Sequence, residues 1–170
     1  MSRMDECLRC LEALGIEYEL IRHEALDTME KCRLAEEQLH VSVPRNIFLC
    51  TRNQRAFALL TLNAQAPFRT SDISKQAGMS RLSFAPAERM DELLGTYPGA
   101  LSPLGLMFDT DRNVRFLLDQ ELVKEPFLGF HPVDNRATVK LATQELLNVF
   151  LPACGHEAHL VSIHCSMEAK

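Results

Sequence analysis

The sequence lacks the features that mark several specialised classes of protein. Its 170 residues contain no run of about 18 apolar residues, so we expect no transmembrane helix and no membrane partner. The stretch from Met1 to Glu6 has no apolar core of the kind that a signal peptide needs. No internal repeat, low-complexity tract or linker is apparent. These absences favour one domain over residues 1–170, in the cytoplasm, with the six cysteines reduced.

The chain also lacks an excess of positive charge. It has 18 Lys and Arg against 23 Asp and Glu, a net charge of −5, which argues against a protein that coats nucleic acid or binds DNA stably. The charge is uneven, however: residues 1–44 carry −5, residues 45–89 carry +5 and residues 90–170 carry −5. The central segment either forms a local anion site or consists of ordinary solvated charges.

Hydrophobic periodicity predicts a mixed α/β class, with a partly antiparallel sheet flanked by helices. A β-hairpin is expected from two apolar runs, 41–51 and 56–62. Residues 97–105 contain two prolines and two glycines and should be irregular. The other expected helices are 3–14, 27–39, 71–78, 86–95 and 144–151, and the other expected strands are 16–21, 82–85, 106–108, 114–118, 137–142 and 160–164, with a loop or short strand at 127–132.

Common catalytic motifs are missing: there is no Gly-x-Ser-x-Gly elbow, phosphate-binding loop or His-Glu-x-x-His. Cys7 and Cys10 form a Cys-x-x-Cys pair, but it falls inside the first helix and not at a helix N-terminus after a strand. Together with Cys154, His156 and His159 these thiols would complete a zinc site only if the two ends of the chain met. We therefore expect no metal and no cofactor, and retain a thiol or zinc protein as the weakest alternative.

Three short segments carry the main functional signal. Arg45 and Asn46 stand at the start of an apolar strand, Gly99 to Pro103 forms a Gly-x-x-x-Pro loop, and His131 lies beside a proline-containing turn that ends at Asn135. The glycine would allow backbone amides to approach a ligand closely. Taken singly, each has a plain alternative as a strand-end charge, a packed turn or a loop histidine.

Together, in this order, these segments resemble the YbaK and prolyl-tRNA-synthetase-associated editing domains, and most closely the free-standing Ala-tRNA(Pro) deacylases. The resemblance covers nearly the whole chain. It implies a compact domain with a curved sheet and a pocket for the aminoacylated acceptor end of tRNA. The implied reaction is trans-editing, the hydrolysis of the ester that joins a wrong amino acid to the terminal ribose.

The resemblance also implies roles for individual residues. Arg45 stands where the family usually has a lysine that contacts the terminal nucleotide, and arginine still binds phosphate. Asn46 would bind substrate, Gly99 would offer backbone donors to the ester, and His131 would lie near the amino acid and the attacking water. The further substrate-binding positions implied are Thr28, Met29, Cys32, Ala100, Leu101, Ser102, Pro103 and Asn135.

No protein nucleophile is required for such a reaction, because an aminoacyl ester is already activated. The enzyme mainly orients the ester and stabilises the developing oxyanion. Alanine would be accepted and the larger prolyl group excluded by size. Two alternatives remain: the same reaction on Ser-, Thr- or Cys-tRNA, and a non-catalytic module that binds a tRNA end or a nucleotide. Either tRNA-binding hypothesis predicts modest, salt-sensitive affinity.

Overall fold

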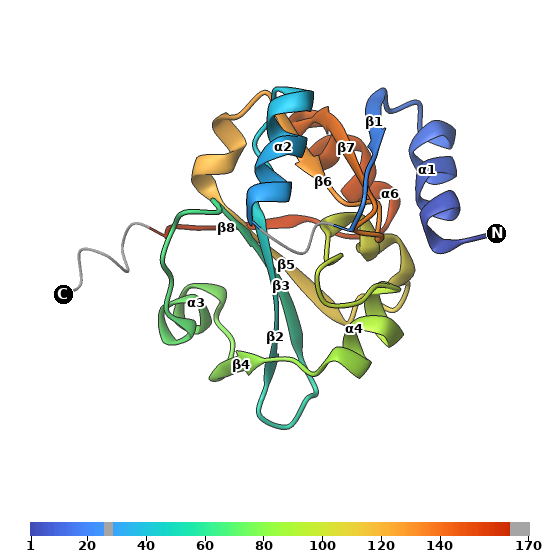
Figure 1. Cartoon of the computed structure of the whole chain (residues 1–170). Coiled ribbons are helices and arrows are strands. Elements are labelled where there is room, and N and C mark those ends of the chain that lie inside the picture. The colour runs from blue at the N-terminus through green and yellow to red at the C-terminus, as the bar shows by residue number, and fades with distance from the viewer. Residues whose placement is uncertain (26–28, 164–170) are drawn as a thin grey trace.

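The computed structural model describes residues 1–25 and 29–163, and it confirms the mixed α/β class (Figure 1). The helices are α1 (Arg3–Ala13), α2 (Met29–Leu39), α3 (Thr70–Ala77), α4 (Ala87–Leu94), α5 (Thr143–Glu145) and α6 (Leu151–Ala153), with the 3-10 helices η1 (Pro103–Phe108) and η2 (Gln120–Lys124) and the π-helix η3 (Leu146–Phe150). The strands are β1 (Tyr18–Arg22), β2 (Arg45–Thr51), β3 (Phe57–Leu62), β4 (Leu82–Phe84), β5 (Val114–Asp119), β6 (Phe127–Phe130), β7 (Ala137–Ala142) and β8 (Ala158–Val161).

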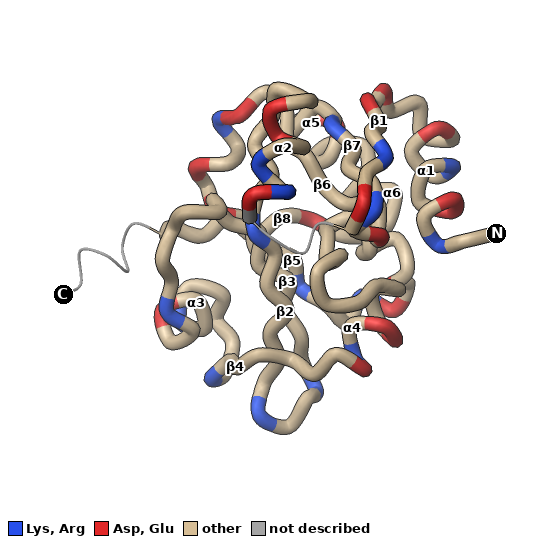
Figure 2. Tube along the Cα trace, viewed as in Figure 1, with Lys and Arg blue, Asp and Glu red and all other residues tan. Residues whose placement is uncertain are grey.

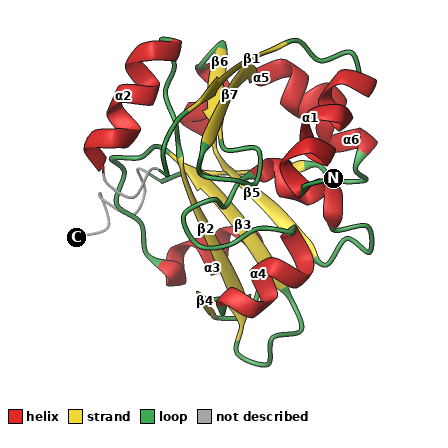
Figure 3. Cartoon of the chain, turned by 45° about the vertical axis from the view of Figure 1, so that its right-hand side comes forward, coloured by secondary structure: helices red, strands yellow, loops and turns green. Residues whose placement is uncertain are grey.

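The strands form two sheets in place of the one that the sequence predicts (Figure 3). The larger sheet has the order β4-β2-β3-β5-β8, antiparallel among β4, β2 and β3 and parallel among β3, β5 and β8. The smaller sheet, β1-β7-β6, is wholly antiparallel. The hairpin of β2 and β3 is confirmed, with Arg45 opposite Leu62 in the register.

Alternation along β3 explains how the larger sheet is covered on both faces. Leu59 belongs to the main core, which also receives α1, α4 and the smaller sheet. Leu60, the next residue, belongs to a second core cluster with Ile73 and Ala77 of α3. The sheet is therefore an inner layer between α3 and the rest of the molecule.

Local signals explain most of the predicted elements. The N-terminal helix begins as expected, because Ser2 accepts a hydrogen bond from the Asp5 amide and the Asp5 carboxylate reaches back in a capping box. The predicted strand over residues 106–108 is wrong: these residues belong to η1, whose first turn is capped by the Ser102 hydroxyl and contains Pro103 at its start. The predicted helix at 144–151 is confirmed as a helical segment, but its centre is the π-helix η3.

A crossing between the segment before β2 and strand β6 links the two sheets. Ser42 forms a parallel bridge with Leu128 of β6, and the Gly129 amide donates to the Ser42 carbonyl at 3.0 Å. A side chain at Gly129 would crowd this crossing, because an added Cβ would lie 2.9 Å from Val43 Cγ2 and 3.0 Å from Val41 Cγ1. Glycine at this position allows the two backbones to approach closely.

No helix among residues 1–25 and 29–163 is long and apolar enough to cross a membrane.

We predict that Gly129→Ala destabilises the protein by about 1–3 kcal/mol, as overpacking typically does. Urea unfolding of the single variant and of Gly129→Ala in a Val43→Ala background would measure the coupling between the two positions. The substitution should cost less in the Val43→Ala background, because the closest clash is removed. Equal costs in both backgrounds would contradict crowding against Val43 as the cause.

Candidate functional site

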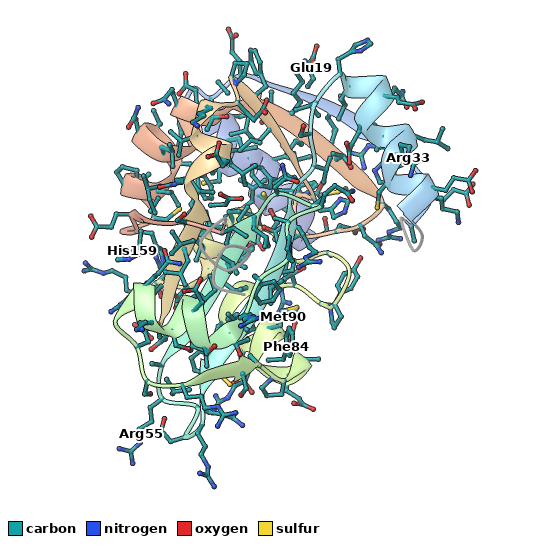
Figure 4. The ribbon with its side chains drawn as sticks, turned by 90° about the vertical axis from the view of Figure 1, so that its left-hand side faces the viewer. Glu19, Arg33, Arg55, Phe84, Met90 and His159 are labelled. Atoms are coloured by element: carbon teal, nitrogen blue, oxygen red, sulfur yellow. The ribbon has the colours of Figure 1, made fainter. Side chains whose placement is uncertain are left out.

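A cavity of about 410 Å³ opens where α2, the start of β2, the 97–102 loop and the end of β6 meet. This size is within the range usual for small-molecule sites. Figure 4 shows Arg33 on the helix that borders it. The lining residues are Cys32, Arg33, Glu36, Val43, Pro44, Arg45, Asn46, Ala64, Gln65, Gly99, Leu101 and His131.

The first two residues of β2 supply polar groups to the cavity. Arg45 is exposed, and its guanidinium lies over the Phe68 ring, 5.3 Å from the centroid. A cation–π contact of this kind orients the side chain and keeps its N–H groups available for an anion. Asn46 is oriented by Thr61, whose hydroxyl donates to Asn46 Oδ1 at 2.6 Å. This bond leaves the Asn46 NH₂ group as a donor for a ligand.

The loop that carries Gly99 is tied to the loop after β6. Thr96 Oγ1 donates to the Ala100 carbonyl at 3.0 Å and lies 3.3 Å from the Val133 carbonyl. The Tyr97 hydroxyl donates to Asn135 Oδ1 at 3.0 Å and accepts from the Asn135 amide at 3.2 Å. These bonds hold the two loops as one unit.

Each of the two loops contains a residue with left-handed backbone close to these hydrogen bonds. Gly99 has φ of +95°, which favours glycine. Val133 has φ of +55° although it is β-branched, a costly conformation that persists only when the surroundings enforce it. Its side chain is buried, and its carbonyl lies within reach of Thr96. The backbone around the cavity is thus strained and locally constrained.

Asp134 anchors the same loop through Arg136. The guanidinium donates from Nε to Oδ1 at 3.0 Å and from a terminal nitrogen to Oδ2 at 2.8 Å, a bidentate pair. The hydrogen bond from Arg136 is the main reason that the pKa of Asp134 falls to about 2. The carboxylate therefore stays ionised over the whole neutral range.

His131 reaches the cavity as a neutral imidazole. Its Nδ1 lies 2.9 Å from the Ala137 carbonyl, which can only accept, so Nδ1 carries the proton and Nε2 has a free lone pair. Burial lowers the pKa of His131 below its ordinary value of 6.5. His23 lies behind it, at 6.3 Å between ring centroids, with His23 Nε2 2.8 Å from the Thr138 hydroxyl. Repulsion from His23 lowers the His131 pKa further.

Glu36 is a half-buried carboxylate on the α2 side of the cavity. Burial raises its pKa, while the Val43 amide and the Arg33 guanidinium lower it in part. An acid in this environment is suited to pair with a cation that enters the cavity.

The structure brings together six of the positions proposed from the sequence: Cys32, Arg45, Asn46, Gly99, Leu101 and His131 all line the cavity. Four others are not among its lining residues. Ala100, Ser102 and Pro103 are buried in the loop and the start of η1, and Asn135 holds the Tyr97 hydroxyl. Thr28 lies outside the described residues, and Met29 begins α2.

Sequence reasoning missed the acidic and basic residues of α2. Arg33 and Glu36 follow Cys32 by one and four positions, so one helical turn carries all three to the cavity. The i, i+4 spacing of Cys32 and Glu36 was the available signal that both side chains share one face of the helix. It points to the cavity only when α2 is known to lie beside β2.

The cysteines of the thiol alternative do lie near one another. Cys7, Cys10 and Cys154 pack on the main core, and Cys7 interacts electrostatically with both others. Burial raises the pKa of Cys7 and of Cys154 to about 12, so both remain protonated at neutral pH and are poor nucleophiles. Across residues 1–25 and 29–163, no group of three or more His, Cys, Asp and Glu is arranged to hold a metal ion.

Fold and cavity together define a mixed α/β domain with a ligand pocket between a sheet edge and two tied loops. Residues 23–149 match the family model of the aminoacyl-tRNA editing domain. The chain therefore belongs to the aminoacyl-tRNA editing domain family, as its sequence motifs predict.

Known relatives agree with this assignment. The prolyl-tRNA editing protein ProX of Acetoanaerobium sticklandii is 29% identical over 136 residues, covering 80% of this chain and 83% of that protein. The mouse prolyl-tRNA synthetase associated domain-containing protein 1 is 30% identical over 151 residues, which cover 86% of this chain and 88% of the mouse protein. A crystal structure described as a proposed trans-editing enzyme for prolyl-tRNA synthetase superposes with a TM-score of 0.71 at 17% identity, over 96% of this chain and 98% of that one, which shows the shared fold.

We predict that His131 titrates below pH 6.5 in the folded protein, because burial disfavours its charged form. The unfolded chain takes up that proton near pH 6.5, so the free energy of unfolding should fall as the pH drops from 6.5 toward the folded pKa. NMR titration of the imidazole, assigned with a His131→Asn variant, measures the shift. A pKa at or above 6.5 would contradict the buried neutral state.

Proposed function

We propose that this protein is a trans-editing deacylase of the cytoplasm that hydrolyses the ester of mischarged tRNA(Pro), with Ala-tRNA(Pro) as its preferred substrate. The observation that carries the proposal is the convergence of Arg45, Asn46, Gly99 and His131 on one cavity. The names of ProX and of the prolyl-tRNA synthetase associated proteins support the choice of tRNA(Pro).

In the proposed complex, the terminal nucleotide enters along β2. The Arg45 guanidinium binds its phosphate, and the Asn46 NH₂ group donates to the sugar or to the ester. The Gly99 loop offers backbone N–H groups to the carbonyl oxygen, which becomes an oxyanion in the transition state. The strained, hydrogen-bonded loops supply these donors with little reorganisation when the charge develops.

Water is the proposed nucleophile. Its oxygen attacks the ester carbonyl carbon, the bond from that carbon to the ribose oxygen breaks, and a proton passes to the departing ribose oxygen. His131 is available at Nε2 to orient the water and to accept its proton, because Nδ1 is committed to the Ala137 carbonyl. The products are a free amino acid and intact tRNA.

Glu36 recognises the α-ammonium group of the amino acid in this proposal. Among the described residues that line the cavity it is the one carboxylate, and an aminoacyl ester carries its ammonium group on the carbon next to the carbonyl. Cys32 and Leu101 also line the cavity and would limit the amino-acid side chain that fits. Exclusion of a larger group by such walls can discriminate strongly.

A non-catalytic tRNA-end-binding module is the second candidate. The observation that favours it is Arg45 itself, which replaces the usual lysine of the family and lies over Phe68. Salt-sensitive tRNA binding without ester cleavage, together with a gain of cleavage in Arg45→Lys, would establish this candidate.

The main proposal predicts that Arg45→Ala lowers kcat/KM for Ala-tRNA(Pro) on the order of 10²-fold, because the terminal nucleotide loses its anchor. Hydrolysis of tRNAs carrying alanine, serine, threonine, cysteine or proline would be followed for the wild type and this variant. Arg9→Ala, which removes an exposed arginine from α1, is the matched control. Background rates for every substrate in the wild type would exclude the deacylase; a faster rate on Ser-, Thr- or Cys-tRNA would change its substrate.

For Glu36→Gln we predict a loss of about tenfold in kcat/KM on Ala-tRNA(Pro), since a hydrogen bond to a charged group is replaced by a neutral one. The exposed neighbour Glu37→Gln should have no effect. On N-acetylalanyl-tRNA, which has no ammonium group, wild type and Glu36→Gln should be equal. A persisting difference on that substrate would mean that Glu36 acts in another way.

A further inference from the structure

Two histidines and a threonine form a row across the smaller sheet. Strand β7 is the central strand of that sheet, between β1 and β6, and Figure 2 shows the three strands at the same end of the molecule as α2. His23 is the residue after β1, and His131 is the residue after β6. Thr138 of β7 is opposite Ile21 of β1, two positions before His23, so the Thr138 side chain lies between the two imidazoles.

The hydrogen bonds along this row have one direction when both imidazoles are neutral. The Glu24 carbonyl lies 2.8 Å from His23 Nδ1 and can only accept, so Nδ1 carries the proton and Nε2 has the lone pair. The Thr138 hydroxyl, 2.8 Å from His23 Nε2, therefore donates to it. The Thr138 oxygen then has only lone pairs to offer to His131 Nδ1, at 3.5 Å.

This direction restricts the tautomer of His131. Its Nδ1–H faces the Ala137 carbonyl at 2.9 Å and the Thr138 hydroxyl at 3.5 Å, and neither oxygen has a proton to give to Nδ1. The tautomer with its proton on Nε2 would place the Nδ1 lone pair against both oxygens. Hydrogen bonds in a chain polarise one another, so donation to His23 also makes the Thr138 oxygen a better acceptor.

His23 acts on His131 from outside the main cavity. It is not among the residues that line that cavity, and it lines a separate cavity of about 200 Å³ between β1 and α2. Its backbone amide donates to the Arg136 carbonyl at 2.9 Å, which fixes the position of the ring beside β7. Thr138 is fully buried, so neither residue is placed to touch a ligand of the main cavity.

We propose that His23 and Thr138 are positioning residues for His131, an inference that rests on the proposed function. They hold the imidazole in the tautomer whose Nε2 accepts a proton from the attacking water. The Thr138 oxygen also stabilises the imidazolium that forms in this step, next to the Ala137 carbonyl. A carboxylate has this task in the Ser-His-Asp triad. Here a hydroxyl that is fixed by a second histidine performs it.

Two pairs of substitutions separate the hydrogen bonds from the packing. Thr138→Val and His23→Leu remove the hydroxyl and the acceptor, whereas Thr138→Ser and His23→Gln keep them. On Ala-tRNA(Pro), kcat should fall about three- to tenfold in the first pair at unchanged KM, and stay within about twofold of the wild type in the second. Thr143→Val, which removes a buried hydroxyl bonded to the Glu125 carbonyl, is the control and should keep the wild-type rate.

The double variant His23→Leu/Thr138→Val should lose no more activity than either single variant, because both changes interrupt the same chain. Multiplied losses in the double variant, or equal losses in the two pairs, would overturn the proposal. Urea unfolding confirms that each variant is folded. If His23→Leu is unfolded, His23→Phe, which keeps a ring but no acceptor, takes its place.

The tautomer of His131 provides a measurement that needs no catalysis. Nitrogen-15 NMR distinguishes a ring nitrogen that carries a proton from one that does not. The wild type should show the proton on Nδ1. His23→Leu should show part of the population with the proton on Nε2, because the released Thr138 hydroxyl can donate to Nδ1. The double variant should return to the Nδ1 tautomer, since no donor remains. An unchanged tautomer in His23→Leu would overturn the proposal.

The proposed function and the positioning role fail in different ways. Background hydrolysis by the wild type would exclude the deacylase, and the tautomers in the wild type, His23→Leu and the double variant would still decide whether His23 and Thr138 fix His131. Wild-type hydrolysis that is unchanged in Thr138→Val and His23→Leu would retain the deacylase and overturn the positioning role.

Discussion

The parallel bridge between Ser42 and Leu128 aligns the two halves of the pocket. Arg45 and His131 each stand three residues beyond this bridge, on chain segments that run in the same direction. The start of β2 thus supplies the cation, and the residue after β6 supplies the imidazole, at matching positions. The close approach depends on Gly129, since any side chain there meets Val41 and Val43. A shift at this crossing would separate the two groups without altering either.

The loops around the crossing add a second constraint, namely backbone rigidity. Thr96, Tyr97 and Asn135 join the Gly99 loop to the loop after β6, and the left-handed Val133 is held within this network. Strain stored in this way is typical of functional sites, where it keeps donors in place before the ligand arrives. Oxyanion stabilisation by backbone amides needs this property, because donors that must first reorganise contribute less.

Local signals in the sequence account for much of the fold. The Ser2 cap, the β2–β3 hairpin and the alternation of β7 depend on neighbouring residues, and these were predictable. The division into two sheets depends on distant packing and was not predictable. The 3-10 helix at 103–108 was missed although Ser102 and Pro103 mark its start, and the π-helix η3 was missed within a correctly predicted helical segment.

The candidate site divides in the same way. Arg45, Gly99 and His131 were found because short motifs carry them, and all three line the cavity. Glu36 has no motif, and its place in the cavity depends on how α2 packs. Ala100, Ser102 and Pro103 lie in the motif but are buried and are not among the residues that line the cavity.

The charge distribution and the chemistry of the pocket both fit an enzyme that binds its substrate briefly. An editing enzyme must hold a tRNA long enough to cleave one ester and then release it, so a strongly basic surface would be a disadvantage. Here the net charge is +5 over residues 45–89 and −5 over each of the flanking segments, 1–44 and 90–170. For the proposed reaction, a neutral imidazole, backbone donors and a half-buried carboxylate in the pocket would suffice, because an aminoacyl ester is already activated. The proposed substrate therefore accounts for both features of the sequence. A large anion that must be released explains the modest net charge, and a labile ester that needs precise placement explains the missing nucleophile motif.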